Sequence, residues 1–168
     1  MKKIKVLLMS LVLITCMLGA NGTVAASSYS SGKAFIPYYS QSDTLKTVYT
    51  VANITDSPIT VTVTIYNADG TLVTDDNSST TGRITASTDF LNYSDQNIDS
   101  SLTFTLNAHN TGYFIMNYNS AYNYGYGVIN WTQNGTAVQG LVVTGKNISS
   151  SNNTLIHHYI PVNNGLPF

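Results

Sequence analysis

A strict alternation of apolar and polar side chains over residues 59–66 constrains the fold of this chain more than any other feature. Extended backbone points successive side chains to opposite faces, so a period of two places one row in a core and the other towards water. This pattern predicts a half-buried strand of an antiparallel sheet. Residues 67–70 supply turn chemistry ending in glycine, which predicts a hairpin that returns over residues 71–74. The apolar row consists of Ile59, Val61, Val63 and Ile65.

Short strand-like segments recur along the rest of the chain, separated by turn-rich stretches, and no segment has a convincing helical period. The dipeptide Asn134-Gly135 predicts a tight turn that joins residues 126–133 and 136–144 in a second hairpin. We therefore expect an all-β fold of about eight or nine strands, built as a single antiparallel β-sandwich (Ig-like or jelly-roll) over residues 33–168. The other expected strands are residues 33–39, 46–53, 102–106, 113–118 and 154–162.

Residues 1–26 have the composition of a secretory signal peptide. Three lysines precede an apolar run over residues 6–20, and small residues end at Ala26, where a signal peptidase would cut. The run is too short for a permanent membrane anchor. We expect residues 27–32 to form a flexible lead, and the mature domain to be secreted or held at the cell surface, or in the periplasm of a Gram-negative cell. Lipidation of Cys16 stays open, because a lipoprotein signal also ends at cysteine.

The charge of the mature domain excludes one class of partner. Four basic residues remain after the signal against eight aspartates, so 4 minus 8 gives a net charge of −4. Nucleic acid is not an expected partner, because no basic stripe exists to displace counterions from phosphates. The single cysteine lies inside the signal, so a hydrophobic core rather than disulfides must stabilise the fold.

The titratable residues predict neither an enzyme nor a bound cofactor. Glycoside hydrolysis needs two carboxyl groups across the scissile bond, whereas every aspartate here falls in an expected turn or loop. His157 and His158 are adjacent in an expected strand and point to opposite faces, so they cannot share a metal ion. His158 follows an apolar face and is expected to be a hydrogen-bonded core residue. A structural calcium ion in residues 75–77 or 89–99 stays open, although neither segment matches a spaced ligand loop.

Aromatic and amide side chains concentrate in residues 113–131, which form our candidate ligand-binding segment. Aromatic rings stack on the apolar face of a sugar while amides hydrogen-bond its hydroxyls, and tyrosine loses little side-chain entropy on binding. The alternative is that these rings only pack within the sheets, since strands favour aromatic residues, and Trp131 fits a core position equally well. The candidate site residues are Tyr118, Tyr122, Asn123, Tyr124, Tyr126 and Trp131.

Self-assembly is the competing function. The strand over residues 59–66 is uncharged, and at a sheet edge it would lack the lysine or proline that discourages pairing with another chain. It could then accept an extended segment from a neighbour, with residues 27–32 or 163–168 as candidate donors. The alternative is that this strand is internal or covered.

Three segments near the start of the mature chain carry a family resemblance, namely Phe35-Ile36-Pro37-Tyr38-Tyr39, Thr50-Val51-Ala52-Asn53 and Val61-Thr62-Val63-Thr64-Ile65-Tyr66. They are similar to the opening of the sensory rhodopsin transducer family and of related bacterial sandwich domains. The resemblance implies a small, oligomeric antiparallel sandwich, and it carries over no functional residue. The signal peptide departs from a cytoplasmic transducer.

Together these patterns predict an exported bacterial β-sandwich without catalytic activity. Our first interpretation is a structural or adhesive subunit that self-assembles or binds other surface proteins. The second is a carbohydrate-binding module that uses residues 113–131, and an enzyme is the least favoured. Exposed Tyr122 and Tyr124 side chains would favour sugar binding, whereas an unprotected edge at residues 59–66 would favour assembly.

Overall fold

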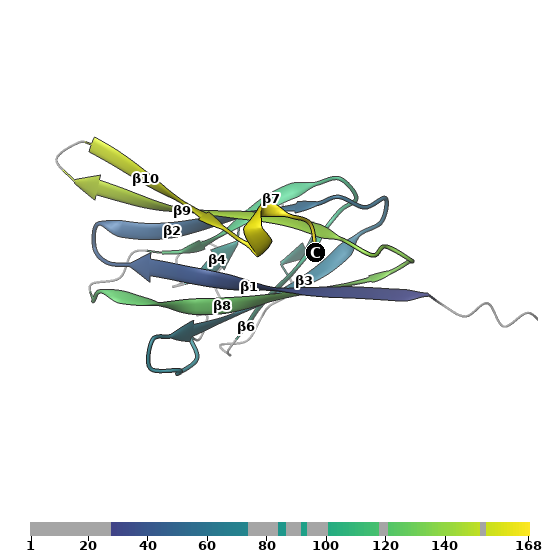
Figure 1. The fold of residues 1–168 in the computed structure, drawn as a ribbon, viewed down its shortest axis with the longest axis horizontal. Helices are drawn as coiled ribbons and strands as arrows, with labels where there is room; N and C mark the ends of the chain where they lie inside the picture. Colours follow the sequence, from purple (N-terminus) through teal and green to yellow (C-terminus); the bar gives the residue numbers. More distant parts are fainter. Residues whose placement is uncertain (1–27, 74–83, 87–91, 94–100, 118–120, 152–153) are drawn as a thin grey trace, which may run out of the picture.

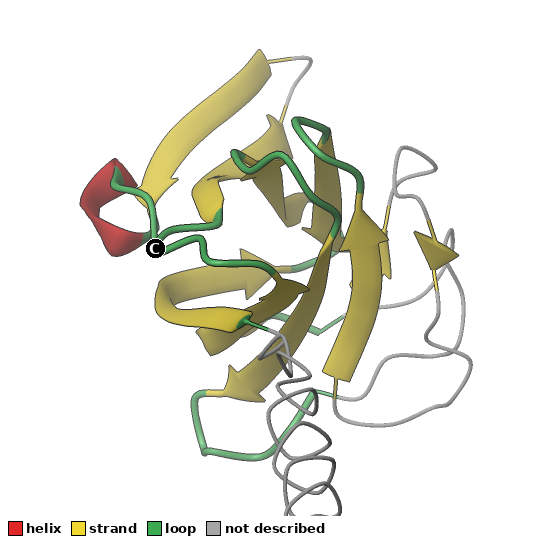
Figure 2. Cartoon of the chain, turned by 90° about the vertical axis from the view of Figure 1, so that its right-hand side faces the viewer, coloured by secondary structure: helices red, strands yellow, loops and turns green. Residues whose placement is uncertain are grey.

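The fold is a sandwich of two antiparallel sheets. The computed structural model describes residues 28–73, 84–86, 92–93, 101–117, 121–151 and 154–168. Within these ranges the first sheet has the order β1-β8-β3-β6-β5 and the second has the order β10-β9-β2-β7-β4, and every paired neighbour is antiparallel. The two sheets pack face to face along the long axis of the molecule (Figures 1 and 2). The predicted all-β antiparallel sandwich is confirmed.

Eight of the ten described strands have six or more residues, and the two short ones, β4 and β5, lie at the edges of the sheets. A 3-10 turn, η1 (Asn163–Gly165), follows the last strand. In the described ranges, no helix is long and apolar enough to cross a membrane. The strands are β1 (Tyr29–Gln41), β2 (Leu45–Asn53), β3 (Ile59–Asn67), β4 (Ile84–Ala86), β5 (Asn92–Tyr93), β6 (Ser101–Leu106), β7 (Thr111–Met116), β8 (Asn123–Asn134), β9 (Leu141–Ser151) and β10 (Thr154–Pro161).

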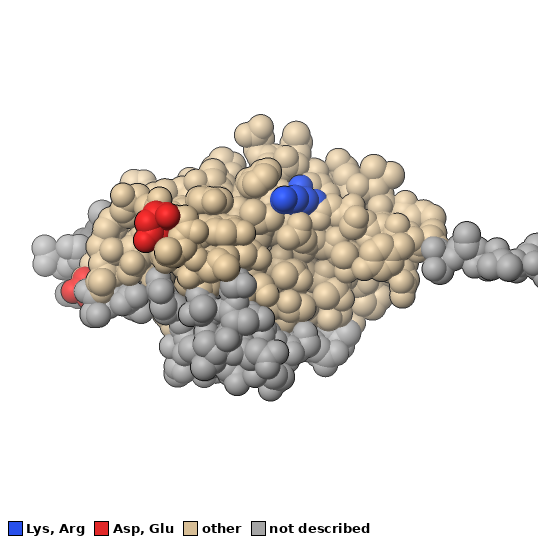
Figure 3. All heavy atoms as spheres, turned by 90° about the horizontal axis from the view of Figure 1, so that it is seen from below, with Lys and Arg blue, Asp and Glu red and all other residues tan. Residues whose placement is uncertain are grey.

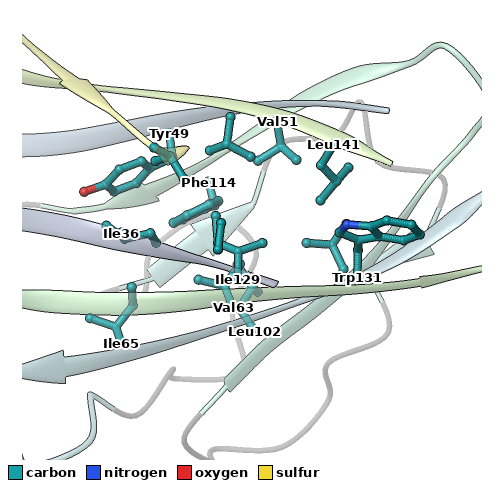
Figure 4. Packing of buried hydrophobic residues seen from close by; sticks show 14 of the residues in the cluster. Ile36, Tyr49, Val51, Val63, Ile65, Leu102, Phe114, Ile129, Trp131 and Leu141 are labelled. Atoms are coloured by element: carbon teal, nitrogen blue, oxygen red, sulfur yellow. The ribbon is translucent and has the colours of Figure 1, made fainter. Parts of the chain in front are cut away.

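The core lies between the sheets and is built from the inward rows of the alternating strands. The four apolar residues of the alternation on β3 are fully buried, whereas the threonines between them are exposed or half-buried. Burying one such valine or isoleucine contributes about 1.5–3 kcal/mol. Figure 4 shows how the inward rows of the two sheets meet: Val63, Ile65 and Leu102 come from the first sheet, and Val51, Phe114 and Leu141 come from the second.

Tyr49 on β2 is a fully buried titratable group of the core. Its ring stacks on Phe114 with 4.9 Å between centroids, and its hydroxyl donates to the carbonyl oxygen of Tyr38. Burial, with a smaller contribution from the neighbouring tyrosines Tyr38 and Tyr39, raises the pKa of Tyr49 well above its ordinary value. The cause is that a phenolate in this position would lose its hydration.

Alkaline pH is therefore expected to destabilise the protein. A tyrosine in the unfolded chain releases its proton near pH 10, while the folded state retains the Tyr49 proton, so stability falls as pH rises above that value. Tyr49→Phe removes this dependence but also loses the hydrogen bond, at a cost of about 1 kcal/mol at neutral pH. Urea unfolding at pH 7 and pH 11 should show a smaller pH-dependent loss for Tyr49→Phe than for wild type. Tyr29→Phe, which alters an exposed ring, should not reduce this loss, and an unchanged loss in Tyr49→Phe would contradict the account.

The edge position considered for residues 59–66 is wrong. Strand β3 lies between β8 and β6, and Thr60, for example, pairs with Thr132 on one side and Thr105 on the other. Both rows of backbone donors and acceptors are thus used inside the sheet. This explains how an uncharged strand can lack protective charges, since only edge strands need them.

The expected hairpin at Asn134-Gly135 is also wrong. Strand β8 ends at Asn134 in the first sheet, whereas β9 begins at Leu141 in the second, so the connection crosses between sheets. The crossing chain packs against the indole of Trp131, because a Cβ atom at Gly140 would lie 2.8 Å from that ring. By contrast, the turn over residues 67–70 is confirmed. Gly70 adopts φ 84°, although the return is one bridge between Tyr66 and Leu72 rather than a strand.

The two candidate donor segments are engaged within their own chain. Residues 29–32, expected in a flexible lead, belong to β1 and pair with β8 from Tyr29 to Gly32. Glycine at position 32 leaves space for the Trp131 indole, whose Nε1 would lie 2.3 Å from an added Cβ atom. At the other terminus, the Phe168 N–H donates to the Leu141 carbonyl, and the Phe168 carbonyl accepts from Leu141 and Gly140. Residues 1–27, including the expected signal and Cys16, lie outside the described residues.

Candidate ligand-binding surface

Three tyrosines stand on the outer face of the first sheet where β8 begins. Tyr122, Tyr124 and Tyr126 are 58%, 49% and 43% exposed. They alternate with Asn123 and Gly125, and the glycine faces inward. A Cβ atom at Gly125 would lie 1.9 Å from the Tyr66 carbonyl oxygen, so only glycine allows β3 and β8 to approach this closely. The period of two then places the rings outside.

Neighbouring aromatic side chains hold these rings in position. Tyr126 stacks on Tyr66 of β3, with 5.0 Å between centroids and 12° between planes. Tyr122 and Tyr124 lie 5.7 Å apart at 34°, and the Tyr122 hydroxyl is 3.2 Å from the hydroxyl of Tyr38 on β1. This hydrogen bond is the main reason that the pKa of Tyr122 is raised. The contacts restrict the rings before any ligand arrives, which reduces the entropy lost on binding.

A depression of about 250 Å³ opens beside Tyr122 and Tyr124. The turn after β3 forms its other wall with Asn67, Ala68 and Asp69, and Asn123 completes the lining. It therefore combines two rings with two amides and one carboxylate. Among its lining residues Asp69 is the only carboxylate, so the paired carboxyl groups of glycoside hydrolysis are not present among them.

The polar groups of this depression are fixed by the turn that carries them. Asp69 accepts from the Thr71 backbone N–H at 3.0 Å and from the Thr71 hydroxyl at 2.7 Å, and these bonds lower the pKa of Asp69. The Asn67 side chain accepts from the Tyr39 hydroxyl and donates to Thr71, both at 2.9 Å. Asn123 donates to the Ala121 carbonyl at 3.0 Å. The depression is thus preformed.

Charge is sparse over the part of the surface that the described residues form. Figure 3 shows one face on which basic and acidic side chains are isolated among uncharged ones. The charged residues in the described ranges are Lys33, Lys46, Lys146, Asp43, Asp56 and Asp69. A surface of this composition suits an uncharged ligand recognised by hydrogen bonds and ring contacts rather than by ion pairs.

The candidate residues separate into three groups. Tyr122, Asn123 and Tyr124 line the depression, and Tyr126 is exposed beside it. Tyr118 lies outside the described residues. Assigning Trp131 to the binding surface is wrong: its side chain is fully buried, and its Nε1 donates to the Phe168 carbonyl at 2.7 Å. The parity of β8 explains this, because odd-numbered positions such as Trp131 face the core while even-numbered positions face water.

Sequence reasoning missed the part of the site that β1 and β3 contribute. Residues 67–70 predicted only a turn, so Asn67 and Asp69 were not candidates. The two tyrosines missing from the candidates are Tyr38 on β1 and Tyr66 on β3. Pairing of Tyr66 with Tyr126 brings this turn to the start of β8. The alternation placed Tyr66 on the outer row of β3, but no local pattern indicates which strand lies beside β3.

The histidines form no metal site in the described part of the chain, where no group of three potential ligands occurs. His109 Nε2 lies 2.9 Å from a carboxylate oxygen of Asp56, within hydrogen-bond distance, and both side chains are exposed. The expectation that His158 is a core residue is wrong, because His158 and its neighbour Tyr159 are both exposed. Consecutive strand residues point to opposite faces, so both faces of the edge strand β10 are in water here. The candidate calcium segments, 75–77 and 89–99, fall largely outside the described residues and remain untested.

Comparisons with known proteins give a distant structural likeness. No protein-family model matches the chain, and no curated protein matches it. A solved structure of a Thermotoga maritima protein, "Crystal Structure of Thermotoga maritima 1070", superposes with a TM-score of 0.44 at 8% identity, over 77% of this chain and 90% of that chain. The resemblance of the N-terminal strands to the sensory rhodopsin transducer family stays a prediction.

Proposed function

We propose that the protein is an exported, non-catalytic domain that binds carbohydrate on the surface formed by Tyr122, Tyr124 and the turn after β3. The observation that carries this proposal is the exposure of both tyrosines beside a preformed depression that contains Asn67, Asp69 and Asn123. The domain would act at the cell surface or outside the cell.

The chemistry of a sugar matches the surface in three respects. A pyranose has an apolar face that packs on an aromatic ring, and the two rings at Tyr122 and Tyr124 offer such faces. Its hydroxyls both donate and accept, as the amide of Asn123 and the carboxylate of Asp69 require. The depression is shallow and open to water, which suits a ligand that remains partly solvated.

An adhesive role is compatible with this surface, but the protein would then attach by binding glycans. Strand addition at residues 59–66 is excluded by the internal position of β3, and both proposed donor segments are bound to their own chain. Strand addition at β3 is therefore not part of this proposal, and we assign adhesion to recognition of glycans.

The double variant Tyr122→Ala/Tyr124→Ala tests the proposal. Both side chains are exposed, so the variant should fold, while its affinity for glycan should fall at least about tenfold, equal to 1.4 kcal/mol. A glycan array followed by calorimetry on the bound sugars provides the measurement. Tyr159→Ala is the matched control, because it removes an exposed tyrosine from β10 and should bind like wild type. Equal affinity of the double variant and the control would overturn the proposal.

A further inference from the structure

A second depression lies at the opposite end of β8 from the tyrosine surface. It has a volume of about 390 Å³ and is formed by the loop after β2 and the loop after β8. Strand β8 has twelve residues and extends along the long axis of the molecule (Figure 1). Asn123 lines the first depression and Gln133 lines the second, so ten residue rises along β8 place these two lining residues about 33 Å apart.

Gln133 makes this depression a candidate site. Its side chain is 7% exposed, and it lines the cavity. One end of its amide is bonded to the Thr55 hydroxyl at 2.9 Å. The other end lies against Gly135, where an added Cβ atom would come within 2.7 Å, and within the described residues no protein group bonds to it. A buried polar end without a protein partner requires water or a ligand.

The network behind Gln133 indicates which partner fits. The Thr55 hydroxyl has one proton and lies 2.9 Å from three acceptors, on Asn53, Ser57 and Gln133. The Thr55 hydroxyl can donate to the Gln133 amide oxygen or accept from the Gln133 NH2 group, so either orientation of this amide is possible. In each orientation the other polar end of the amide faces the depression. A ligand hydroxyl can both donate and accept, so it pairs with that end in either orientation.

The remaining lining favours an uncharged ligand. Ser57 and Thr136 add hydroxyls, and Ile54, which is 42% exposed, adds an apolar wall. The carboxylate of Asp56 is at the rim, where its side chain is 98% exposed and paired with His109. A carboxylate already paired and in water attracts a cationic ligand weakly.

We infer that this depression is a second binding site, for a neutral hydroxyl-bearing ligand of the sugar class, and that the protein bridges two glycan chains from its two ends. The second site stands on Gln133 and its surroundings alone. The bridging role also rests on the proposed function of the tyrosine surface.

Titration calorimetry with neutral tetrasaccharides, namely cellotetraose, maltotetraose and mannotetraose, tests the inference on the purified protein. Wild type should bind two molecules of at least one sugar. Thr136→Trp changes an exposed lining residue and fills the depression, so binding should fall to one molecule. Gln133→Met, which keeps the length but removes the amide, should weaken the second site about tenfold. Val138→Trp, in the same loop but 90% exposed and outside the lining, should still bind two.

Each outcome separates the two proposals. One bound molecule that is lost in Tyr122→Ala/Tyr124→Ala and unaffected by Thr136→Trp and Gln133→Met overturns the second site and leaves the proposed function standing. One molecule lost in Thr136→Trp and Gln133→Met but unaffected by the tyrosine changes supports the second site and overturns the tyrosine surface. Absence of binding by all three sugars overturns the inference, while the glycan array decides the proposed function separately.

Discussion

Trp131→Ala is expected to lower the free energy of unfolding by about 3–5 kcal/mol, the range for removing a large aromatic ring from a core. The ring is fully buried, and its Nε1 binds the Phe168 carbonyl at 2.7 Å. Added Cβ atoms at Gly32 and Gly140 would each lie under 3 Å from it. The indole thus holds the start of β1, the crossing loop and the C-terminus together, and its loss should loosen all three.

Urea unfolding of the purified protein measures this effect. Trp131→Phe keeps an aromatic ring and should lose less stability than Trp131→Ala. Val138→Ala serves as the surface control, because Val138 is 90% exposed and such changes stay within about 0.5 kcal/mol. A loss of less than about 1 kcal/mol in Trp131→Ala would contradict the core position of the indole.

Gly125→Ala is expected to remove about 3 kcal/mol of stability, the upper end of the usual range for overpacking, and to abolish glycan binding. The new methyl group would meet the Tyr66 carbonyl oxygen at 1.9 Å, and backbone cannot move aside as a flexible side chain does. Strands β3 and β8 must separate, which is severe overpacking. Since Gly125 lies between Tyr124 and Tyr126, the same shift displaces the binding surface.

Gly165→Ala is the control that measures the cost of an unfavourable backbone conformation without a steric clash. Nothing lies within 4 Å of a Cβ atom at Gly165, but its φ of 77° disfavours alanine, so the cost should be about 1–2 kcal/mol. Thermal unfolding and calorimetry with the same glycan compare the two variants. If Gly125→Ala costs no more than Gly165→Ala and keeps wild-type affinity, the close approach of β3 and β8 is contradicted.

Local pattern predicted most of the strands because the burial of a strand residue depends on the parity of its position. The alternation over residues 59–66 therefore identified β3 and its buried row. Its place between β8 and β6 depends on pairing with residues at least 37 positions away, the separation of Thr64 and Ser101. Neither period nor propensity carries that information, so the sequence left an edge position and an internal position open.

The turn signals show the same limit. Asp69-Gly70 predicted a turn correctly, because the side chain of Asp69 and the φ of Gly70 act within four residues. Asn134-Gly135 carries an equally strong hairpin signal, yet the chain crosses to the other sheet there. Packing of the crossing loop on Trp131 outweighs the local preference.

The candidate site was predicted in part for a comparable reason. Composition alone located Tyr122, Asn123 and Tyr124, which are close together in the chain. Asn67 and Asp69 join them only because β3 pairs with β8 so that Tyr66 lies opposite Tyr126. Trp131 has the chemistry of a sugar platform but the wrong parity on β8.

A nuclear magnetic resonance titration of the nitrogen-15-labelled protein, with a glycan selected on the array, tests the central claim most directly. Binding at the tyrosine surface predicts the largest amide shifts at Asn123, Tyr124, Ala68 and Asp69, which line the depression. Shifts confined to strands of the second sheet, or no shifts with any array-selected glycan, would contradict a carbohydrate site at this end of β8.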